Sequence, residues 1–316
     1  MIVAAAQIAP VLLDREATLE RIESAARESA AAGARLIAFP ETILPGYPTW
    51  IAKTGGAQFD DPIQKELHGR YLDQAVELPG PVLTRLQSLA GDTQQSLVIG
   101  VAERGIETGR GTLYATALVV HPDGNWTAHR KLVPTYEERL AWGWGDGHGL
   151  VVHTIDGWRV SVLNCWENWM PAARLALYAQ GTELHISLWP GSPSLTEDIS
   201  RFTAREGRVY VLAASGVMGP SDVPLDLPGG AEFRKTLLDN APAAGLHSGG
   251  SRLIRPDGSE QDALVTNEPG LLIQSLDRSR VLAERQNFDA AGHYHRPDVF
   301  HFEVDRGRRQ AATFQD

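Results

Sequence analysis

The chain has 316 residues, of which 43% are hydrophobic and 22% charged, and this composition is typical of a globular protein with a sizeable core. A formal net charge of −10 argues against nucleic acid as a partner, because nucleic-acid binding needs basic surface. A single cysteine rules out an intrachain disulfide and favours the cytoplasm, and no apolar run approaches the roughly 20 residues that cross a bilayer.

The first half of the chain alternates apolar strands with amphipathic helices. One helix is capped by Asp14 and stopped by Gly33, and a second begins at Pro81 and runs toward Gly91. Residues 122–124, Pro-Asp-Gly, form a turn between the last two strands of this half. The strands are predicted at residues 2–8, 36–39, 97–102, 113–120 and 126–130.

The second half repeats this alternation and adds two hairpins. The Asp156-Gly157 turn pairs residues 151–155 with 158–163, and the turn at 256–258 pairs residues 251–254 with 264–265. Between the hairpins we expect a helix over 172–179, a strand over 184–188, a helix over 196–208 and a strand over 209–214, and after them a strand over 271–276. Two groups of strands predict an α/β protein with two packed mixed sheets and helices outside. Residues 52–76 and 220–247 are predicted as long loops with roles in function or assembly.

Cys165 follows the apolar run 160–163 and precedes a helix that begins near Pro171. The N-terminus of a helix carries partial positive charge, which favours the thiolate, the reactive form of the side chain. The alternative for a lone cysteine is a small buried apolar residue without chemical function.

Three further ionisable residues lie at or shortly after predicted strand ends. Glu41 follows an apolar strand and Pro40, Lys131 directly follows residues 126–130, and Glu138 comes seven residues after Lys131. Each of these residues, taken alone, is better explained as a solvated side chain. Together with Cys165 they form a coherent set, because sites in α/β sheets gather beyond the carboxyl ends of strands.

The segments around these residues resemble the signature segments of the nitrilase superfamily, the carbon–nitrogen hydrolases. They are Pro-Glu at 40–41, His-Arg-Lys-Leu-x-Pro-Thr at 129–135 and Asn-Cys-Trp-Glu-Asn-x-Met-Pro at 164–171. Trp-Gly-Trp-Gly-Asp-Gly at 142–147, Trp-Pro-Gly at 189–191 and Gly-His-Tyr-x-Arg-Pro-Asp at 292–298 resemble the true nitrilase branch. The resemblance spans residues 2–300 in order. It implies a single domain over 1–300, followed by a short tail over 301–316.

The resemblance implies a four-layer αββα sandwich, a Glu–Lys–Cys triad, a second supporting glutamate, and neither metal nor organic cofactor. It assigns the general base to Glu41, the stabilising lysine to Lys131, the nucleophile to Cys165 and the supporting acid to Glu138. It also implies a homodimer built around the helix after Cys165, or a higher homo-oligomer. Because only 19 residues follow Pro297, filaments built by longer C-terminal extensions are not expected.

The implied reaction is hydrolysis of a nitrile to a carboxylic acid and ammonia. A thiolate is the strongest nucleophile among side chains and suits the weakly polarised nitrile carbon. We expect Tyr47, Trp166, Trp189 and Pro190 to form a flat apolar slot for aromatic or arylaliphatic nitriles, although core packing is an equal explanation for Trp189. His129 lies two residues before Lys131 on the same strand face, where it contacts the site or a dimer partner.

Alternatives remain within and outside this class. An aliphatic amidase or a cyanide hydratase uses the same triad. His293, His295 and His301 match no metal-ligand spacing, so a metal enzyme is disfavoured. An inactive scaffold is also disfavoured, since no triad position is missing.

The sequence does not determine whether Cys165 rests as thiol or thiolate, because Lys131 lowers the pKa of the thiol and the two carboxylates raise it.

Overall fold

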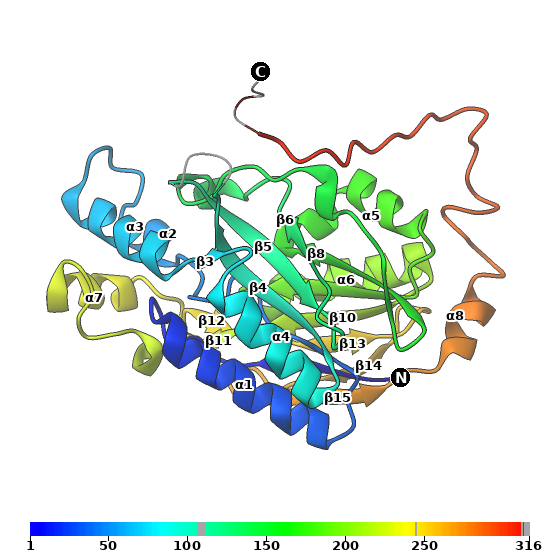
Figure 1. Cartoon of the computed structure of the whole chain (residues 1–316), viewed down its shortest axis with the longest axis horizontal. Coiled ribbons are helices and arrows are strands. Elements are labelled where there is room, and N and C mark those ends of the chain that lie inside the picture. Colours follow the sequence, from blue (N-terminus) through cyan, green and yellow to red (C-terminus); the bar gives the residue numbers. More distant parts are fainter. Residues whose placement is uncertain (107–110, 244, 311, 313–316) are drawn as a thin grey trace.

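In a computed structural model, the protein has two mixed β-sheets that pack face to face, with helices on both outer sides (Figure 1). The structure describes residues 1–106, 111–243, 245–310 and 312. The predicted four-layer α/β architecture is therefore confirmed. No helix in these described ranges has the length and apolar character needed to cross a membrane.

The first sheet runs in the order β15-β1-β2-β4-β5-β6, with the short β3 beside β4. Its strands are β1 (Ile2–Gln7), β2 (Leu36–Ala38), β3 (Val76–Glu77), β4 (Ser96–Arg104), β5 (Leu113–Val120), β6 (Trp126–Arg130) and β15 (Gly270–Ser275). The second sheet runs in the order β14-β13-β10-β9-β8-β7. Its strands are β7 (His153–Ile155), β8 (Trp158–Asn164), β9 (Leu184–Trp189), β10 (Tyr210–Ser215), β13 (Arg252–Ile254) and β14 (Glu260–Ala263).

Alternation of side chains along the strands builds the layers. On β1, Val3 and Ala5 pack into the core between the sheets, whereas Ala4 and Ala6 pack under the helices that cover the first sheet. Helices α1 (Arg15–Ala31) and α4 (Pro81–Thr93) cover the first sheet, and α5 (Pro171–Tyr178) and α6 (Pro193–Gly207) cover the second. The remaining α-helices and strands are α2 (Trp50–Lys53), α3 (Pro62–Gln74), α7 (Gly230–Asp239), α8 (Arg278–Glu284) and the pair β11 (Val217–Met218) and β12 (His247–Ser248).

Two expectations from the sequence are wrong. Residues 52–76 and 220–247 are not loops throughout, since the first contains α3 and the second contains α7. Helix α3 buries only Leu67 and Tyr71. Helix α7 buries only Phe233 and Leu237. Two apolar positions, four residues apart, are too few to produce a clear helical stripe. The second strand of the last hairpin is β14 at Glu260–Ala263, not 264–265. Its four residues are mostly polar because β14 is an edge strand.

The C-terminal segment crosses the outside of the molecule toward β6, which is an edge strand of the first sheet (Figure 1). Arg308 bonds the buried carboxylate of Asp146 at 3.2 Å and the Ala128 carbonyl of β6 at 3.1 Å. The backbone carbonyl of Asp305 lies against Gly147, where a Cβ would be only 2.1 Å from it. The tail therefore covers the edge of β6, the strand that Lys131 directly follows. The division at residue 300 stays a prediction, and residues 311 and 313–316 of the tail lie outside the described range.

Arg308→Gln should lower the thermal midpoint of unfolding by a few degrees. The change removes the ion pair of Asp146, and an underpaired buried polar group costs about 1–3 kcal/mol. Arg296→Gln is the control, since Arg296 pairs with Asp298 at the exposed surface and should leave the midpoint unchanged. Equal melting of wild type and Arg308→Gln in calorimetry would contradict the role given to the tail.

Candidate active site

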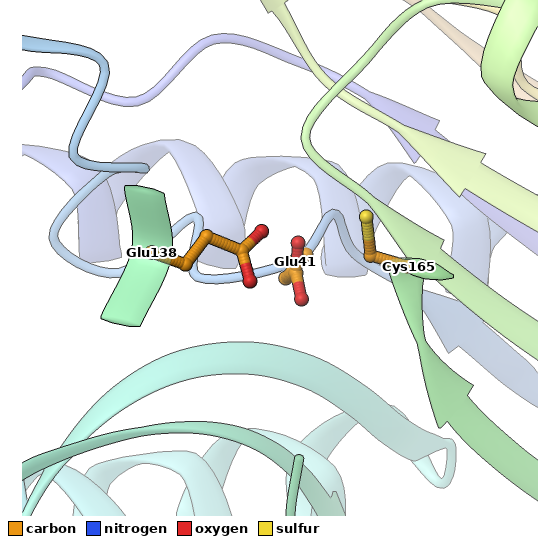
Figure 2. Close-up of side chains that lie close together, drawn as sticks. All are labelled: Glu41, Glu138 and Cys165. Atoms are coloured by element: carbon orange, nitrogen blue, oxygen red, sulfur yellow. The ribbon is translucent and has the colours of Figure 1, made fainter. Parts of the chain in front are cut away.

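The four residues predicted as catalytic come together, three of them beyond the carboxyl ends of strands from both sheets and Glu138 on a 3₁₀ turn, Tyr136–Leu140. Glu41 lies three residues after β2, Lys131 directly follows β6, and Cys165 directly follows β8. Figure 2 shows Glu41 between Glu138 and Cys165, and one side-chain atom of each lies within 4.8 Å of the others. All four side chains are buried. The site is therefore a closed cluster of ionisable groups.

Lys131 holds the two carboxylates together. Its Nζ donates to Oε1 of Glu41 at 2.9 Å and to Oε2 of Glu138 at 2.6 Å. Burial opposes the charge of the lysine, but the surrounding Glu41, Cys165 and Glu138 outweigh it and raise the pKa of Lys131. The ammonium group therefore stays charged throughout the physiological pH range.

Glu41 has one oxygen on Lys131 and one that is free to exchange a proton. Its Oε2 is buried and has no hydrogen-bond partner among the described residues. Burial raises the pKa of Glu41 to about 8; Lys131 acts in the opposite direction, and the negative charge of Glu138 adds to the increase. A carboxyl group with a pKa close to neutral pH is suited to both accepting and donating protons.

Cys165 opens a five-residue 3₁₀ turn, Cys165–Trp169, and α5 begins only at Pro171. The helix that was expected to favour the thiolate is thus displaced from the sulfur by this turn. Burial and the charge of Glu41 raise the pKa of the thiol well above its ordinary value, although Lys131 and the Trp166 backbone N–H act against them. Cys165 therefore rests as a neutral thiol, and its reaction needs a base.

Comparisons with known proteins agree with this geometry. Residues 2–286 match the family model "Carbon-nitrogen hydrolase". A curated relative named nitrilase 2, from an unknown prokaryotic organism, is 37% identical over 98% of this chain and 94% of its own. An aliphatic nitrilase of Sinorhizobium fredii is 34% identical over 98% of this chain and 97% of its own. The chain belongs to the carbon–nitrogen hydrolase family.

The solved structure of an amidase from Nesterenkonia sp. AN1 has a TM-score of 0.65 to this chain. It is 22% identical, and the match covers 91% of this chain and 97% of the amidase. At that identity the likeness shows the fold alone. The family match shows that the chain is a hydrolase of carbon–nitrogen bonds, as the sequence predicts.

In this hydrolase the turn that carries Cys165 is held by residues whose role the sequence did not reveal. The carboxylate of Glu167 accepts hydrogen bonds from the Asn164 backbone at 3.0 Å, from the Leu132 backbone at 2.8 Å and from His129 at 2.9 Å. His129, expected at the site or at a dimer contact, thus bonds Glu167 instead of a triad member. Because Leu132 follows Lys131, Glu167 fixes the lysine segment and the cysteine turn relative to each other.

Asn168 holds the same turn from the other side. Its Nδ2 donates to the Cys165 carbonyl at 2.8 Å, and its Oδ1 contacts Nε2 of His185, on β9, at 2.7 Å. Ser161 contacts the second nitrogen of His185 at 2.9 Å. Cys165 itself has a φ of 46°, a left-handed conformation that costs a non-glycine residue about 1–2 kcal/mol. The bonds of Glu167 and Asn168 offset that cost.

The predicted pocket residues fall into two groups. Tyr47 donates from its hydroxyl to Oε1 of Glu138 at 2.8 Å, and Trp189 is fully buried in a cluster with Cys165, with Pro190 next in the chain. Trp166, by contrast, has a side chain that is 46% exposed and lies against Trp169, with 6.0 Å between the ring centroids. Only the backbone N–H of Trp166 is directed at the sulfur.

Trp142 is a site residue that the sequence singled out only as part of a segment resembling the true nitrilase branch. Its side chain is buried, and its ring meets the Tyr47 ring edge-on with 5.5 Å between the centroids. The centroid of the Trp142 ring lies 5.7 Å from Nζ of Lys131. Trp144, from the same segment, is 63% exposed. Because Tyr47 and Trp142 are far apart in the chain, the spacing of residues in the sequence cannot predict their contact.

Glu41, Glu138 and Cys165 also have the spacing of possible metal ligands. Nζ of Lys131 already bonds both carboxylates, so a cation would have to compete with a buried ammonium group for the same oxygens. The cluster is therefore poorly suited to a metal. His293, His295 and His301 lie at 292–301 in the C-terminal segment, away from this cluster in the chain.

The ratio kcat/KM should rise about tenfold per pH unit below pH 8 and level off above it, because Glu41 must be ionised to take the Cys165 proton. The Glu138 charge raises the pKa of Glu41, so Glu138→Gln should move the midpoint to lower pH even if it slows turnover. Initial rates between pH 5.5 and 9.5 measure both effects. A profile without a bend in this range would contradict the assignment of Glu41 as base.

Proposed function

We propose that this hydrolase converts organic nitriles, aromatic or arylaliphatic, into carboxylic acid and ammonia through covalent intermediates on Cys165. The observation that carries the proposal is the free oxygen of Glu41, buried beside the thiol while its other oxygen is held by Lys131. The two relatives named nitrilases, which match nearly their whole length, support the choice of nitriles over other carbon–nitrogen bonds.

The first step joins sulfur to the nitrile carbon. The Glu41 carboxylate takes the thiol proton, Sγ attacks the carbon, and the protonated Glu41 returns that proton to the nitrile nitrogen. The product is a neutral thioimidate, and Glu41 is again ionised. Because a base lies beside the thiol, the attack does not require that Cys165 be a thiolate before the substrate binds. This agrees with the raised pKa of Cys165.

The second step replaces nitrogen by oxygen. Glu41 takes a proton from water as the water oxygen adds to the thioimidate carbon and passes that proton to the nitrogen, giving a neutral tetrahedral intermediate with a hydroxyl and an amino group. Glu41 then moves the hydroxyl proton to the amino nitrogen, so that ammonia leaves and a thioester forms. A second water, deprotonated by Glu41, then releases the acid and restores the thiol. Lys131 and the Trp166 N–H are the donors for the negative charge that develops in these intermediates. Glu138 positions Lys131, and loss of the thiol instead of ammonia would release amide.

The rings around the cluster support a flat substrate. Tyr47 and Trp142 pack edge-on beside the ammonium of Lys131, and Trp189 lies in one buried cluster with Cys165. Aromatic faces with a few placed polar groups are typical of small-molecule sites. This arrangement favours aromatic or arylaliphatic nitriles over short unbranched ones.

Intact-mass measurement after brief exposure to a slow nitrile should show an adduct on the wild type and none on Cys165→Ala. Glu41→Gln should form the adduct far more slowly, because the thiol loses its base. Unmodified protein during demonstrable turnover would contradict covalent catalysis.

An aliphatic amidase or a cyanide hydratase would use the same groups. The substrate panel therefore pairs benzonitrile and phenylacetonitrile with their amides and includes cyanide. Ammonia and acid from the nitriles support the proposal. Turnover of the amides alone, or formamide from cyanide alone, would overturn it in favour of the alternative.

We further propose that the hydrolase is a homodimer or a higher homo-oligomer that associates through the face around α5. Trp166 and Trp169 stack there with 46% and 43% of their surfaces exposed, and Phe202 of α6 is 50% exposed beside Arg174. Such a patch is typical of a contact surface. Sedimentation should give at least twice the chain mass, and Trp169→Glu should shift it toward a monomer. A monomeric wild type would contradict this association.

The cytoplasmic location expected from the single cysteine stays a prediction.

A further inference from the structure

Three buried polar residues form a chain of hydrogen bonds that ends on the backbone of Cys165. Ser161 lies on β8, His185 lies on β9, and Asn168 lies in the 3₁₀ turn Cys165–Trp169. The Ser161 hydroxyl contacts Nδ1 of His185 at 2.9 Å, and Nε2 of His185 contacts Oδ1 of Asn168 at 2.7 Å. Nδ2 of Asn168 donates to the Cys165 carbonyl at 2.8 Å. The proposed mechanism gives none of these three side chains a role in the reaction.

The chemistry of these groups fixes the direction of every bond in the chain. The Cys165 carbonyl can only accept, so Asn168 must turn its NH₂ group toward that carbonyl and its oxygen toward His185. Nε2 of His185 must therefore carry the ring proton. Burial lowers the pKa of His185 to about 3, so the ring is neutral at pH 7 and its Nδ1 accepts from the Ser161 hydroxyl. All the donors thus point the same way along the chain, from Ser161 to the Cys165 carbonyl.

The carbonyl at the end of this chain belongs to the peptide group that also carries the Trp166 N–H. A peptide group is planar and trans, so its C=O and its N–H point in opposite directions and turn together. A hydrogen bond that fixes the Cys165 carbonyl therefore also fixes the direction of the Trp166 N–H. Hydrogen bonds in a chain polarise one another, so the donor on the carbonyl strengthens the N–H as a donor. The proposed function uses this N–H to stabilise the negative charge that develops on the substrate.

Other bonds hold the backbone of the turn at different places. Glu167 accepts a hydrogen bond from the Asn164 N–H, and Nη1 of Arg174 donates to the Asn168 carbonyl at 2.7 Å. Neither bond includes the peptide group that follows Cys165. Both bonds remain when the Asn168 side chain is replaced, so we expect the turn to keep its fold. The direction of one N–H can therefore be disturbed separately from the structure of the turn.

We infer that Ser161, His185 and Asn168 are positioning residues that orient and polarise the Trp166 N–H through the Cys165 carbonyl. They act on the reaction through the backbone and do not contact the substrate. The inference rests on the proposed function, in which this N–H is a donor to developing negative charge. Removal of one such donor from an active site costs about 10²–10³ in kcat, and a donor that is present but misdirected should cost less.

The test compares two reactions of the same thiol. Hydrolysis of phenylacetonitrile develops negative charge on the substrate and uses the Trp166 N–H. In alkylation by iodoacetamide, Sγ of Cys165 bonds the methylene carbon, iodide leaves with the electron pair of the carbon–iodine bond, and Glu41 takes the thiol proton. This reaction needs an ordered thiol and its base, but the charge leaves with iodide. Because Cys165 is the only cysteine, the intact mass follows its alkylation alone.

Asn168→Leu is similar in size to the wild-type side chain and removes the donor to the Cys165 carbonyl. The kcat for the nitrile should fall about 10- to 100-fold, because the Trp166 N–H is no longer held in direction. The KM and the rate constant of alkylation should stay close to those of the wild type. His185→Leu, which leaves Oδ1 of Asn168 without a donor, should lower kcat about tenfold. His185→Gln offers an amide N–H in place of the ring N–H and should recover most of that loss.

The matched control is His153→Leu, which also removes a buried histidine from the second sheet. His153 lies on β7 and contacts Thr127 of β6, so it has no part in the chain that ends on Cys165. This variant should leave the ratio of nitrile hydrolysis to alkylation as in the wild type.

The outcomes separate this inference from the proposed function. If the wild type hydrolyses nitriles but Asn168→Leu and His185→Leu lower hydrolysis and alkylation by a common factor, or lower neither, the inference is overturned and nitrile hydrolysis stands. Failure of the wild type to hydrolyse any nitrile would overturn the proposed function and the inference with it. If Asn168→Leu does not fold, the comparison of His185→Leu with His185→Gln decides, since equal loss in both would contradict the need for a donor to Asn168.

Discussion

The site depends on one buried ammonium group between two buried carboxylates. Lys131 bonds Glu41 and Glu138, and with both acids ionised this closed cluster would carry a net negative charge. Uncompensated charge is costly away from water. A proton on Glu41, whose pKa is raised to about 8, removes that excess. The property that relieves the electrostatic cost is the same one that lets Glu41 transfer protons.

The catalytic segments come together because, at two glycines, one stretch of backbone approaches another more closely than a Cβ atom would allow. A Cβ on Gly100 of β4 would lie 2.2 Å from the Pro40 carbonyl and 2.6 Å from Cα of Glu41. A Cβ on Gly145 would lie 2.2 Å from the Arg130 carbonyl, and the Gly145 N–H donates to the Lys131 carbonyl at 2.9 Å. The segment 142–147, noted in the sequence for its glycines and tryptophans, therefore supports the catalytic lysine through its backbone, and the C-terminal tail covers that segment.

The sequence predicted the strands well where turn residues bound apolar runs. The bounds of β5 and β6 agree with prediction to the residue because Pro-Asp-Gly punctuates the chain between them. The helices with only two buried positions and the polar edge strand β14 were missed, because their stability comes from tertiary packing. The four ionisable residues of the cluster were found because each belongs to a short local segment. His185 and Trp142 join the site only through contacts between distant segments, for which spacing along the chain gives no signal.

The structure also changes the physical basis for the reactivity of Cys165. The expected aid from a helix N-terminus is reduced by the 3₁₀ turn between the sulfur and α5, and burial raises the thiol pKa. A standing thiolate beside two carboxylates would add a further negative charge to a cluster that already disfavours one. A thiol that loses its proton only to Glu41, during attack, avoids that charge. It also ties reactivity to a bound electrophile, because the proton has a productive destination only when a nitrile nitrogen is present to receive it.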